Sequence, residues 1–355
     1  MDSVKILGAG PAGLSAAITL AREGYPVDVF EKNSDIGGRF HGEYQGLENW
    51  SDKNDALFDL KKMNLTNNFT HHPFKNLSIT NGDKTWFFNC NKPAFYLVKR
   101  GQVPDSLDNG LKEQSLDRGV EIHFDKKLPQ EQADIIATGP QNQGRFASAR
   151  GIVFQTEMED IVLCLINDKT AVKGYSYLLV ADGTATMSTV LFDRFKDLNT
   201  CFEETLKTYT RFLDLEIKNP QKIGGVGNFS TRNIYVENGR LYIGEAAGLQ
   251  DLLWGFGIKN AIKSGYLAAK SIISGDDYQE TSRKYFNYKL KASLVNRFLW
   301  EKFATNNYSL ILNHIHKSQD HLKYLNNLYK FNFIQKIIYP FALMYMRNRY
   351  GNLNL

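Results

Sequence analysis

The sequence predicts an α/β fold with a Rossmann-type nucleotide-binding unit, an inserted antiparallel sheet and a helical C-terminal region. Three observations lead to this prediction. The chain opens with a strand, a glycine-rich turn, a helix of small residues and a second strand over residues 4–31. Residues 151–236 are rich in strand-forming and aromatic runs, and helical periodicity dominates from residue 258. The alternation of strand and helix at the start is typical of a parallel sheet.

The first motif is a set of glycines spaced Gly-x-Gly-x-x-Gly directly after the opening strand. Gly8 permits a tight turn, Gly10 lets the backbone approach a pyrophosphate, and Gly13 lets the helix pack closely on the strand. Pro11 and Ala12 complete the turn at this site, and the helix that follows from Leu14 points its N-terminal N–H groups toward the phosphates. The motif therefore predicts a dinucleotide site, with an ordinary βαβ unit as the alternative.

An acidic residue, Glu31, ends the second strand, where its carboxylate can accept hydrogen bonds from an adenosine ribose. This arrangement suits both NAD and FAD, so the first motif does not choose between them. The loop that follows contains Lys32, Gly38 and Arg39. Gly38 allows another close approach of the backbone to a ligand, and Arg39 can meet a phosphate. The alternative for this loop is a solvated surface arginine.

The next part of the chain interrupts the βαβ rhythm. Residues 76–90 indicate a β-hairpin, because Asn81-Gly82 is a type I′ turn signal between two strand-forming runs. Residues 133–140 then form a short apolar strand that ends in a glycine turn. We expect this strand to return to the parallel sheet and to bring Gly139 close to the cofactor.

A second glycine-rich segment lies far along the chain. A strand ends at Gly244, Glu245 follows at once, and small residues continue to Gly248. The acid can accept a hydrogen bond from a ribityl hydroxyl, and the small residues let the backbone lie near the pyrophosphate.

A long helix begins directly after this second segment, at Gly255-Phe256-Gly257-Ile258. Its N-terminal N–H groups can stabilise the negative charge at N1 and O2 of a reduced flavin. We expect Gly257 and Ile258 to lie under the flavin. Since a simple NAD dehydrogenase has no use for this second element, the two segments together predict FAD.

The aromatic residues of the middle and late segments suggest a pocket wall. Residues 151–236 indicate an antiparallel sheet with one helix across it, which we expect to roof a pocket. Tyr175 and Tyr177 lie on one of these strands, and Trp254 and Phe256 precede the long helix. We assign these four residues to the pocket, although aromatic strand residues more often pack in a core.

The predicted domains are discontinuous, because the antiparallel segments are inserted into the nucleotide-binding unit. The ranges are 1–75, 95–150 and 237–275 for the Rossmann-type FAD-binding domain, 76–94 and 151–236 for the substrate-domain sheet, and 276–355 for the helical C-terminal region.

The C-terminal region, residues 276–355, interleaves aromatic and basic residues. It holds twelve Lys and Arg against five Asp and Glu. Such a segment can lie on an anionic bilayer with its aromatic rings at the headgroup level. We favour the alternative, in which its apolar face packs on the body of the protein, and peripheral membrane contact stays open.

The composition excludes several classes of protein. A hydrophobic content of 43% with 23% charged residues is typical of a folded chain, and a net charge of +5 is too small to indicate nucleic acid. No apolar run approaches the ~18 residues of a membrane span, and the N-terminus lacks the features of a signal peptide. Widely spaced cysteines favour a reducing compartment, so we expect a cytoplasmic protein. We predict no metal site, because His71-His72 have no acid or cysteine nearby.

Together, the two glycine segments resemble those of FAD-dependent oxidoreductases of the para-hydroxybenzoate hydroxylase type, and most of all the geranylgeranyl reductase branch. Arg100, followed by Asp105 and Leu107, is similar to the Arg…Asp…Leu segment of that family. The resemblance implies that Arg100 lies near the FAD. It covers residues 1–275 and leaves the C-terminal region without a match.

The sequence also departs from this family. The strand from Tyr175 stands where the reductases carry a Tyr-x-Trp-x-Phe-Pro segment, with Tyr177, Leu179 and Val180 in place of its Trp, Phe and Pro. The hydroxylases carry a second Asp-Gly signature, which Asp182-Gly183 imitates, but here it is better interpreted as a hairpin turn. This difference favours a reductase over a hydroxylase.

We therefore predict a reductase of a carbon–carbon double bond in an apolar, isoprenoid substrate, with hydride transfer from flavin N5. The electron donor is NAD(P)H or a ferredoxin-like protein, and the sequence identifies no catalytic acid. One alternative is a flavin monooxygenase or halogenase, although the Trp-x-Trp-x-Ile-Pro segment typical of halogenases is absent. Another alternative is a non-catalytic flavoprotein that binds a membrane surface or a partner.

Overall fold

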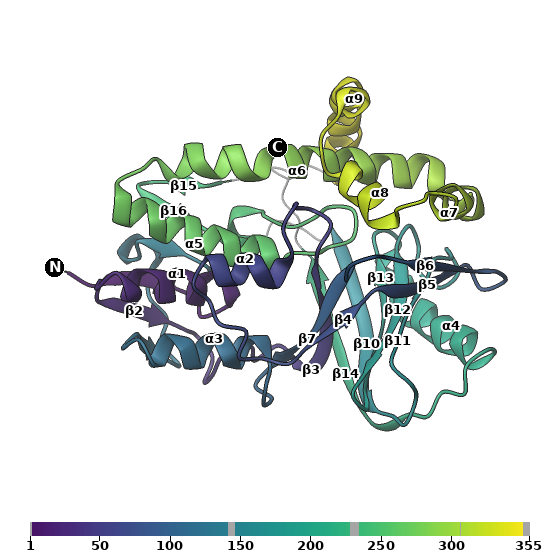
Figure 1. The fold of residues 1–355 in the computed structure, drawn as a ribbon, viewed down its shortest axis with the longest axis horizontal. Helices are drawn as coiled ribbons and strands as arrows, with labels where there is room; N and C mark the ends of the chain where they lie inside the picture. Colours follow the sequence, from purple (N-terminus) through teal and green to yellow (C-terminus); the bar gives the residue numbers. More distant parts are fainter. Residues whose placement is uncertain (1, 141–145, 228–233, 306, 351–355) are drawn as a thin grey trace.

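The computed structural model describes residues 2–140, 146–227, 234–305 and 307–350. Figure 1 shows a parallel sheet with its helices on one side, antiparallel strands on the other, and C-terminal helices along the top of both. The α/β fold class predicted from the sequence is confirmed.

A six-stranded sheet carries the first motif, in the order β15-β16-β9-β1-β2-β8. All neighbours are parallel except the β15–β16 hairpin. The strands are β1 (Val4–Leu7), β2 (Val27–Phe30), β8 (Glu121–His123), β9 (Ile135–Ile136), β15 (Val236–Glu237) and β16 (Arg240–Tyr242). Since β9 pairs with β1, the predicted return of residues 133–140 to this sheet is confirmed.

Two helices that are far apart in the sequence pack closely on each other beside this sheet. They are α1 (Pro11–Arg22) and α5 (Ile258–Ser274). A Cβ at Gly265 of α5 would lie 2.1 Å from the carbonyl oxygen of Ala12 in α1, so only glycine allows this approach. The close packing brings the two glycine segments of the sequence together.

A seven-stranded sheet forms the second layer, in the order β14-β10-β13-β12-β11-β5-β6. Its strands are β5 (Asn76–Thr80), β6 (Thr85–Asn89), β10 (Ala147–Gln155), β11 (Ile161–Leu165), β12 (Tyr175–Ala181), β13 (Thr184–Leu191) and β14 (Lys218–Gly227). The helix α4 (Leu198–Thr210) packs on one face, where Phe202 and Tyr209 join the strand residues in a core.

The hairpin predicted over residues 76–90 is confirmed as β5–β6, but its predicted turn type is wrong. Of the Asn81-Gly82 pair only Gly82 has a positive φ. The Asn81 Oδ1 accepts hydrogen bonds from the backbone N–H groups of Asp83 and Lys84, so the loop has four residues instead of two. The hairpin joins the larger sheet because β5 runs parallel to β11.

A small sheet that the sequence analysis did not anticipate joins the two layers. It consists of β3 (His41–Glu48), β7 (Phe95–Gly101) and β4 (His71–Phe74), in the order β3-β7-β4. The helices α2 (Ala56–Lys62) and α3 (Leu107–Leu116) follow β3 and β7 in the chain. Gly46 of β3 lies against Phe256, and a Cβ there would come within 2.7 Å of the ring.

The C-terminal region is helical, as predicted. It contains α6 (Tyr278–Leu299), a π-helical turn (Trp300–Ala304), α7 (Tyr308–His316), α8 (His321–Leu328) and α9 (Phe333–Tyr350). Phe286 and Leu290 of α6 belong to the same core as α1 and α5. Within the described residues no helix combines the length and hydropathy needed to cross a bilayer.

Candidate functional site

The three glycines of the first motif have different structural roles. A Cβ at Gly8 would lie 2.4 Å from the Ala137 carbonyl oxygen, and one at Gly13 would lie 2.0 Å from the Gly8 carbonyl oxygen. A Cβ at Gly10 would meet no atom of the described residues within 4 Å. The fold therefore requires Gly8 and Gly13, whereas Gly10 leaves open space in front of the N-terminus of α1, where a pyrophosphate fits.

The carboxylate of Glu31 is held beside this glycine turn. It is buried, and its Oε2 accepts a hydrogen bond from the Ala9 N–H at 3.0 Å. Its Oε1 accepts from the Asn33 backbone and side-chain amides. These hydrogen bonds fix the Glu31 carboxylate, a hydrogen-bond acceptor, at the position where the sequence motif predicts the adenosine ribose. Lys32 and Gly38 are exposed on the same loop.

The second glycine segment lies directly against the first. Gly244 has a φ of +61°, and a Cβ on it would lie 2.9 Å from the Ala12 Cβ. Glu245 begins the turn η3 (Gly244–Ala247), and its Oε2 is 3.7 Å from Arg39 Nη2. Arg39, predicted to meet a phosphate, and Glu245, predicted to bind a ribityl hydroxyl, are therefore neighbours in space.

Three further glycines of the prediction lie at turns around the site. Gly139, Gly248 and Gly255 all have positive φ values, between +73° and +81°. Gly257 precedes the first residue of α5, Ile258, and no side chain in the described part of the chain caps this helix N-terminus. The N–H groups of α5 are therefore available to a negatively charged ligand.

Arg100 is held by a partner that the sequence resemblance did not identify. Its guanidinium binds both carboxylate oxygens of Asp108, at 2.8 and 3.0 Å, and donates to Gln45 Oε1. Asp105 and Leu107 were the residues matched to the family segment, but Asp108 makes the contact. Both members of the pair are buried, and Gln45, which accepts from Arg100, lines the cavity described below.

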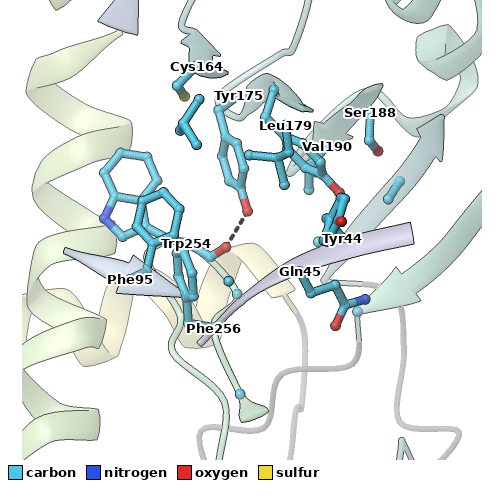
Figure 2. Close-up of a pocket in the computed structure, with 18 of the residues that line it drawn as sticks. Tyr44, Gln45, Phe95, Cys164, Tyr175, Leu179, Ser188, Val190, Trp254 and Phe256 are labelled. Atoms are coloured by element: carbon cyan, nitrogen blue, oxygen red, sulfur yellow. Dashed lines mark hydrogen bonds between the residues drawn. The ribbon is translucent and has the colours of Figure 1, made fainter. Parts of the chain in front are cut away.

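A cavity of about 440 Å³ extends from Glu245 and residues 255–258 of the second glycine segment into the space between the antiparallel strands and the C-terminal helices. Figure 2 shows side chains from several elements converging on it. Four of the residues predicted to bind the cofactor, Arg39, Glu245, Gly257 and Ile258, are in its lining. Its apolar lining includes Leu77, Ile79, Phe88, Phe95, Leu97, Leu163, Leu179, Val190, Phe192, Trp300, Leu312, Ile315 and Leu325.

The four aromatic residues assigned to the pocket from the sequence all line this cavity: Tyr175, Tyr177, Trp254 and Phe256. The Tyr175 hydroxyl donates a hydrogen bond to the Trp254 carbonyl oxygen, drawn as the dashed line in Figure 2. Burial raises the pKa of Tyr177 to about 12 and also raises the pKa of Tyr175 well above its ordinary value, so both phenols stay neutral. The cavity wall therefore carries no phenolate charge.

The sequence analysis missed part of the lining that a strand period of two could have indicated. Leu179 lines the cavity on the same face of β12 as Tyr175 and Tyr177, and Leu178 lies in the core on the face covered by α4. No comparable sequence pattern indicated that side chains of α7 and α8 also line the cavity. Their position depends on how the C-terminal helices fold back over the sheets.

One buried carboxyl group, Glu43, also lines the cavity. Burial raises its pKa above the usual carboxyl range, against the lowering effect of the His41 N–H, which donates to it at 2.5 Å. A buried carboxyl with a raised pKa keeps its proton to higher pH than an exposed one. Glu43 is therefore a candidate acid that the sequence did not single out.

A buried cluster of charges lies behind the loop that follows β3. Asp52 binds Lys289 at 2.5 Å and Lys259 at 3.2 Å, and Lys259 also contacts Glu48 at 3.1 Å. Burial opposes ionisation of Asp52, but the two lysines outweigh it and lower its pKa to about 2. Because Lys259 belongs to α5 and Lys289 to α6, this cluster ties both helices to the loop.

The histidines considered as metal ligands have other partners. His71 Nδ1 lies 2.9 Å from the Phe69 carbonyl oxygen, and His72 Nε2 lies 3.3 Å from the Tyr44 hydroxyl.

Comparisons with known proteins agree with the first motif. A family profile described as an NAD(P)-binding Rossmann-like domain matches residues 6–56. A 1-hydroxycarotenoid 3,4-desaturase from Flavobacterium sp. (strain P99-3) is 51% identical over 41 residues, 12% of this chain and 8% of that protein. An NAD-dependent dihydropyrimidine dehydrogenase subunit from Escherichia coli (strain K12) is 50% identical over 38 residues, 11% of this chain and 9% of that protein. These matches span less than a tenth of the relatives' own length.

Solved structures match over nearly the whole chain. A geranylgeranyl bacteriochlorophyll reductase-like protein from Thermoplasma acidophilum has a TM-score of 0.72 at 17% identity, covering 99% of this chain and 97% of the other. A flavin-dependent brominase has a TM-score of 0.66 at 18% identity, covering 98% and 99%. A flavin-dependent halogenase has a TM-score of 0.61 at 15% identity, covering 99% and 74%.

These likenesses confirm the predicted resemblance at the level of the fold. The open space at Gly10, the fixed carboxylate of Glu31 and the uncapped N-terminus of α5 are the features that a dinucleotide flavin needs. The chain therefore shares the fold of these solved structures, and its two glycine segments fit FAD.

Proposed function

We propose that the chain reduces a carbon–carbon double bond of an apolar, isoprenoid lipid. The observation that carries this proposal is the cavity, which begins at the second glycine segment and continues between apolar side chains of the antiparallel strands and the C-terminal helices. A volume of about 440 Å³ falls in the range of small-molecule sites. Such a lining favours a hydrocarbon chain over a charged substrate.

The residues of this chain would hold the cofactor at three places. Gly10 and the N-terminus of α1 face the pyrophosphate, Glu31 the adenosine ribose, and the N-terminus of α5 the ring system. When bound and reduced, FAD supplies from N5 the hydride that adds to one alkene carbon. Trp254 and Phe256 orient the substrate and exclude water from the cavity.

The other alkene carbon takes up a proton, and Glu43 is the residue that we assign to supply it. Its carboxyl lines the cavity, and its raised pKa favours the protonated form at the oxygen that must donate. The π electrons of the double bond form the new C–H bond to this proton. A donor of the NAD(P)H or ferredoxin class then returns two electrons for the next turnover.

The test is anaerobic turnover of the full-length protein. We expect the protein reconstituted with FAD to be yellow and to be bleached by dithionite. Geranylgeraniol or geranylgeranyl diphosphate should then restore the oxidised absorption spectrum and yield a product with two more hydrogens. A fully saturated analogue of the same length is the control and should restore nothing. Failure of both prenyl probes would overturn the choice of substrate.

A second candidate is an oxygen-dependent reaction, hydroxylation or halogenation of a small molecule. The likeness to a flavin-dependent brominase and a flavin-dependent halogenase supports it. It predicts NAD(P)H consumption that requires both oxygen and an aromatic substrate, whereas the reductase should turn over without oxygen. Comparing the two substrates with and without oxygen separates these reactions.

A further inference from the structure

The outer face of α9 is apolar and uncovered by any described residue. Five of its side chains are between 55 and 75% exposed: Phe333, Ile334, Ile337, Phe341 and Met344. At about 100° per residue they fall within a single stripe about 100° wide. Figure 1 shows α9 projecting beyond the rest of the molecule.

The inner face of the same helix is already used for packing. Ala342 and Met346 are fully buried in a core that includes Phe192 and Leu252. Arg349 binds Glu301 and Asp193, which fixes the C-terminal end of α9 to the body. The exposed stripe is therefore not the face that holds the helix in place.

The charge of this part of the chain is entirely positive. Residues 321–350 contain five Lys and Arg and no Asp or Glu. Two of the basic residues, Lys336 and Arg347, are exposed on α9 and lie beside the apolar stripe. A stripe of exposed Phe, Ile and Met with flanking cations is typical of helices that lie in the interface of an anionic membrane.

We propose that the outer face of α9 docks on the surface of an anionic lipid bilayer. The stripe would enter the boundary between headgroups and acyl chains, and Lys336 and Arg347 would contact lipid phosphates. A second copy of the chain is a poorer occupant of this face, because it would oppose two segments of the same positive charge. The proposal does not depend on the reaction catalysed. The inner face of α9 nevertheless packs near the cavity, because Phe192 belongs both to the core under α9 and to the cavity lining.

The experiment is sedimentation of the full-length protein with vesicles of phosphatidylcholine alone and of phosphatidylcholine with phosphatidylglycerol. We expect binding to the anionic vesicles that weakens as salt rises, and little binding to the neutral ones. The double substitution Ile337→Ser, Phe341→Ser should lower the affinity at least tenfold. Lys336→Glu with Arg347→Glu should weaken binding mainly at low salt.

A matched control is Phe212→Ser, another exposed apolar side chain, which lies beside α4 and should leave binding unchanged. Thermal unfolding of each variant checks that the fold is retained. Equal binding of the wild type and the double variant, or no binding to any vesicle, would overturn the proposal. A self-associated form that dissociates in the double variant would instead assign this face to a second copy of the chain.

Discussion

The cofactor region and the cavity region of this protein are built in different ways. Around the first motif the backbone sets the geometry, because a Cβ at Gly8, Gly13 or Gly265 would lie 2.0–2.4 Å from a carbonyl oxygen. Around the cavity the geometry depends on side chains from the two antiparallel-rich sheets and several helices. The first region therefore tolerates few substitutions, and its sequence pattern is easy to recognise. The second region tolerates more substitutions, and no local sequence pattern identifies it.

The largest expected effect is at the charge cluster that joins the two regions. Asp52→Asn should lower the free energy of unfolding by about 3 to 5 kcal/mol, because it leaves Lys259 and Lys289 buried without their shared carboxylate. Chemical denaturation measures this. Asp83→Asn, in an exposed loop, is the control and should change little.

The same cluster predicts a dependence on pH. The pKa of Asp52 is lowered from 3.8 to about 2, so its contribution is complete above about pH 4 and is lost as the pH falls toward 2. The difference in stability between the wild type and Asp52→Asn should therefore shrink over that interval. A difference that stays constant down to pH 2 would contradict the assignment.

The next effect separates the glycine required by the fold from the glycine required by the ligand. Gly13→Ala should cost about 3 kcal/mol of stability, because its Cβ would overlap the Gly8 carbonyl oxygen. Gly10→Ala should leave stability within about 0.5 kcal/mol of the wild type but lower FAD affinity at least tenfold. Denaturation and flavin titration of the apoprotein measure the two. An unchanged FAD affinity in Gly10→Ala would remove Gly10 from the site.

A smaller effect tests the acid of the cavity. Glu43→Gln should slow substrate reduction by about 100-fold while leaving the FAD content unchanged. The wild-type rate should fall as the pH rises through the raised pKa of Glu43, and the variant should lose this dependence. An unaltered pH profile in the variant would assign the proton to water or to another residue.

The smallest effect concerns the loop that closes the cavity. Tyr175→Phe removes the hydrogen bond to the Trp254 carbonyl oxygen and should cost about 1 to 2 kcal/mol of stability. Tyr288→Phe, at a 40% exposed tyrosine, is the control and should cost less than about 0.5 kcal/mol. Equal losses for the two would show that the hydrogen bond contributes nothing.

The sequence predicts the βαβ unit, the second glycine segment and the hairpin at residues 76–90 because local patterns determine them. It does not predict the β3-β7-β4 sheet, since β3 and β7 are far apart in the chain and carry no turn signal between them. Asp108 was missed as the partner of Arg100 for a related reason. Family spacing pointed to Asp105, whereas the contact follows from the first turn of α3.

The order of strands in the parallel sheet has a consequence for biosynthesis. β16 and α5, which complete the wall of the flavin site, come from residues 240–274, after the whole seven-stranded sheet has been made. A ribosome must therefore release most of the polypeptide before the nucleotide cleft can close. Chains truncated before residue 240 lack β16 and α5, and we expect them to retain no flavin.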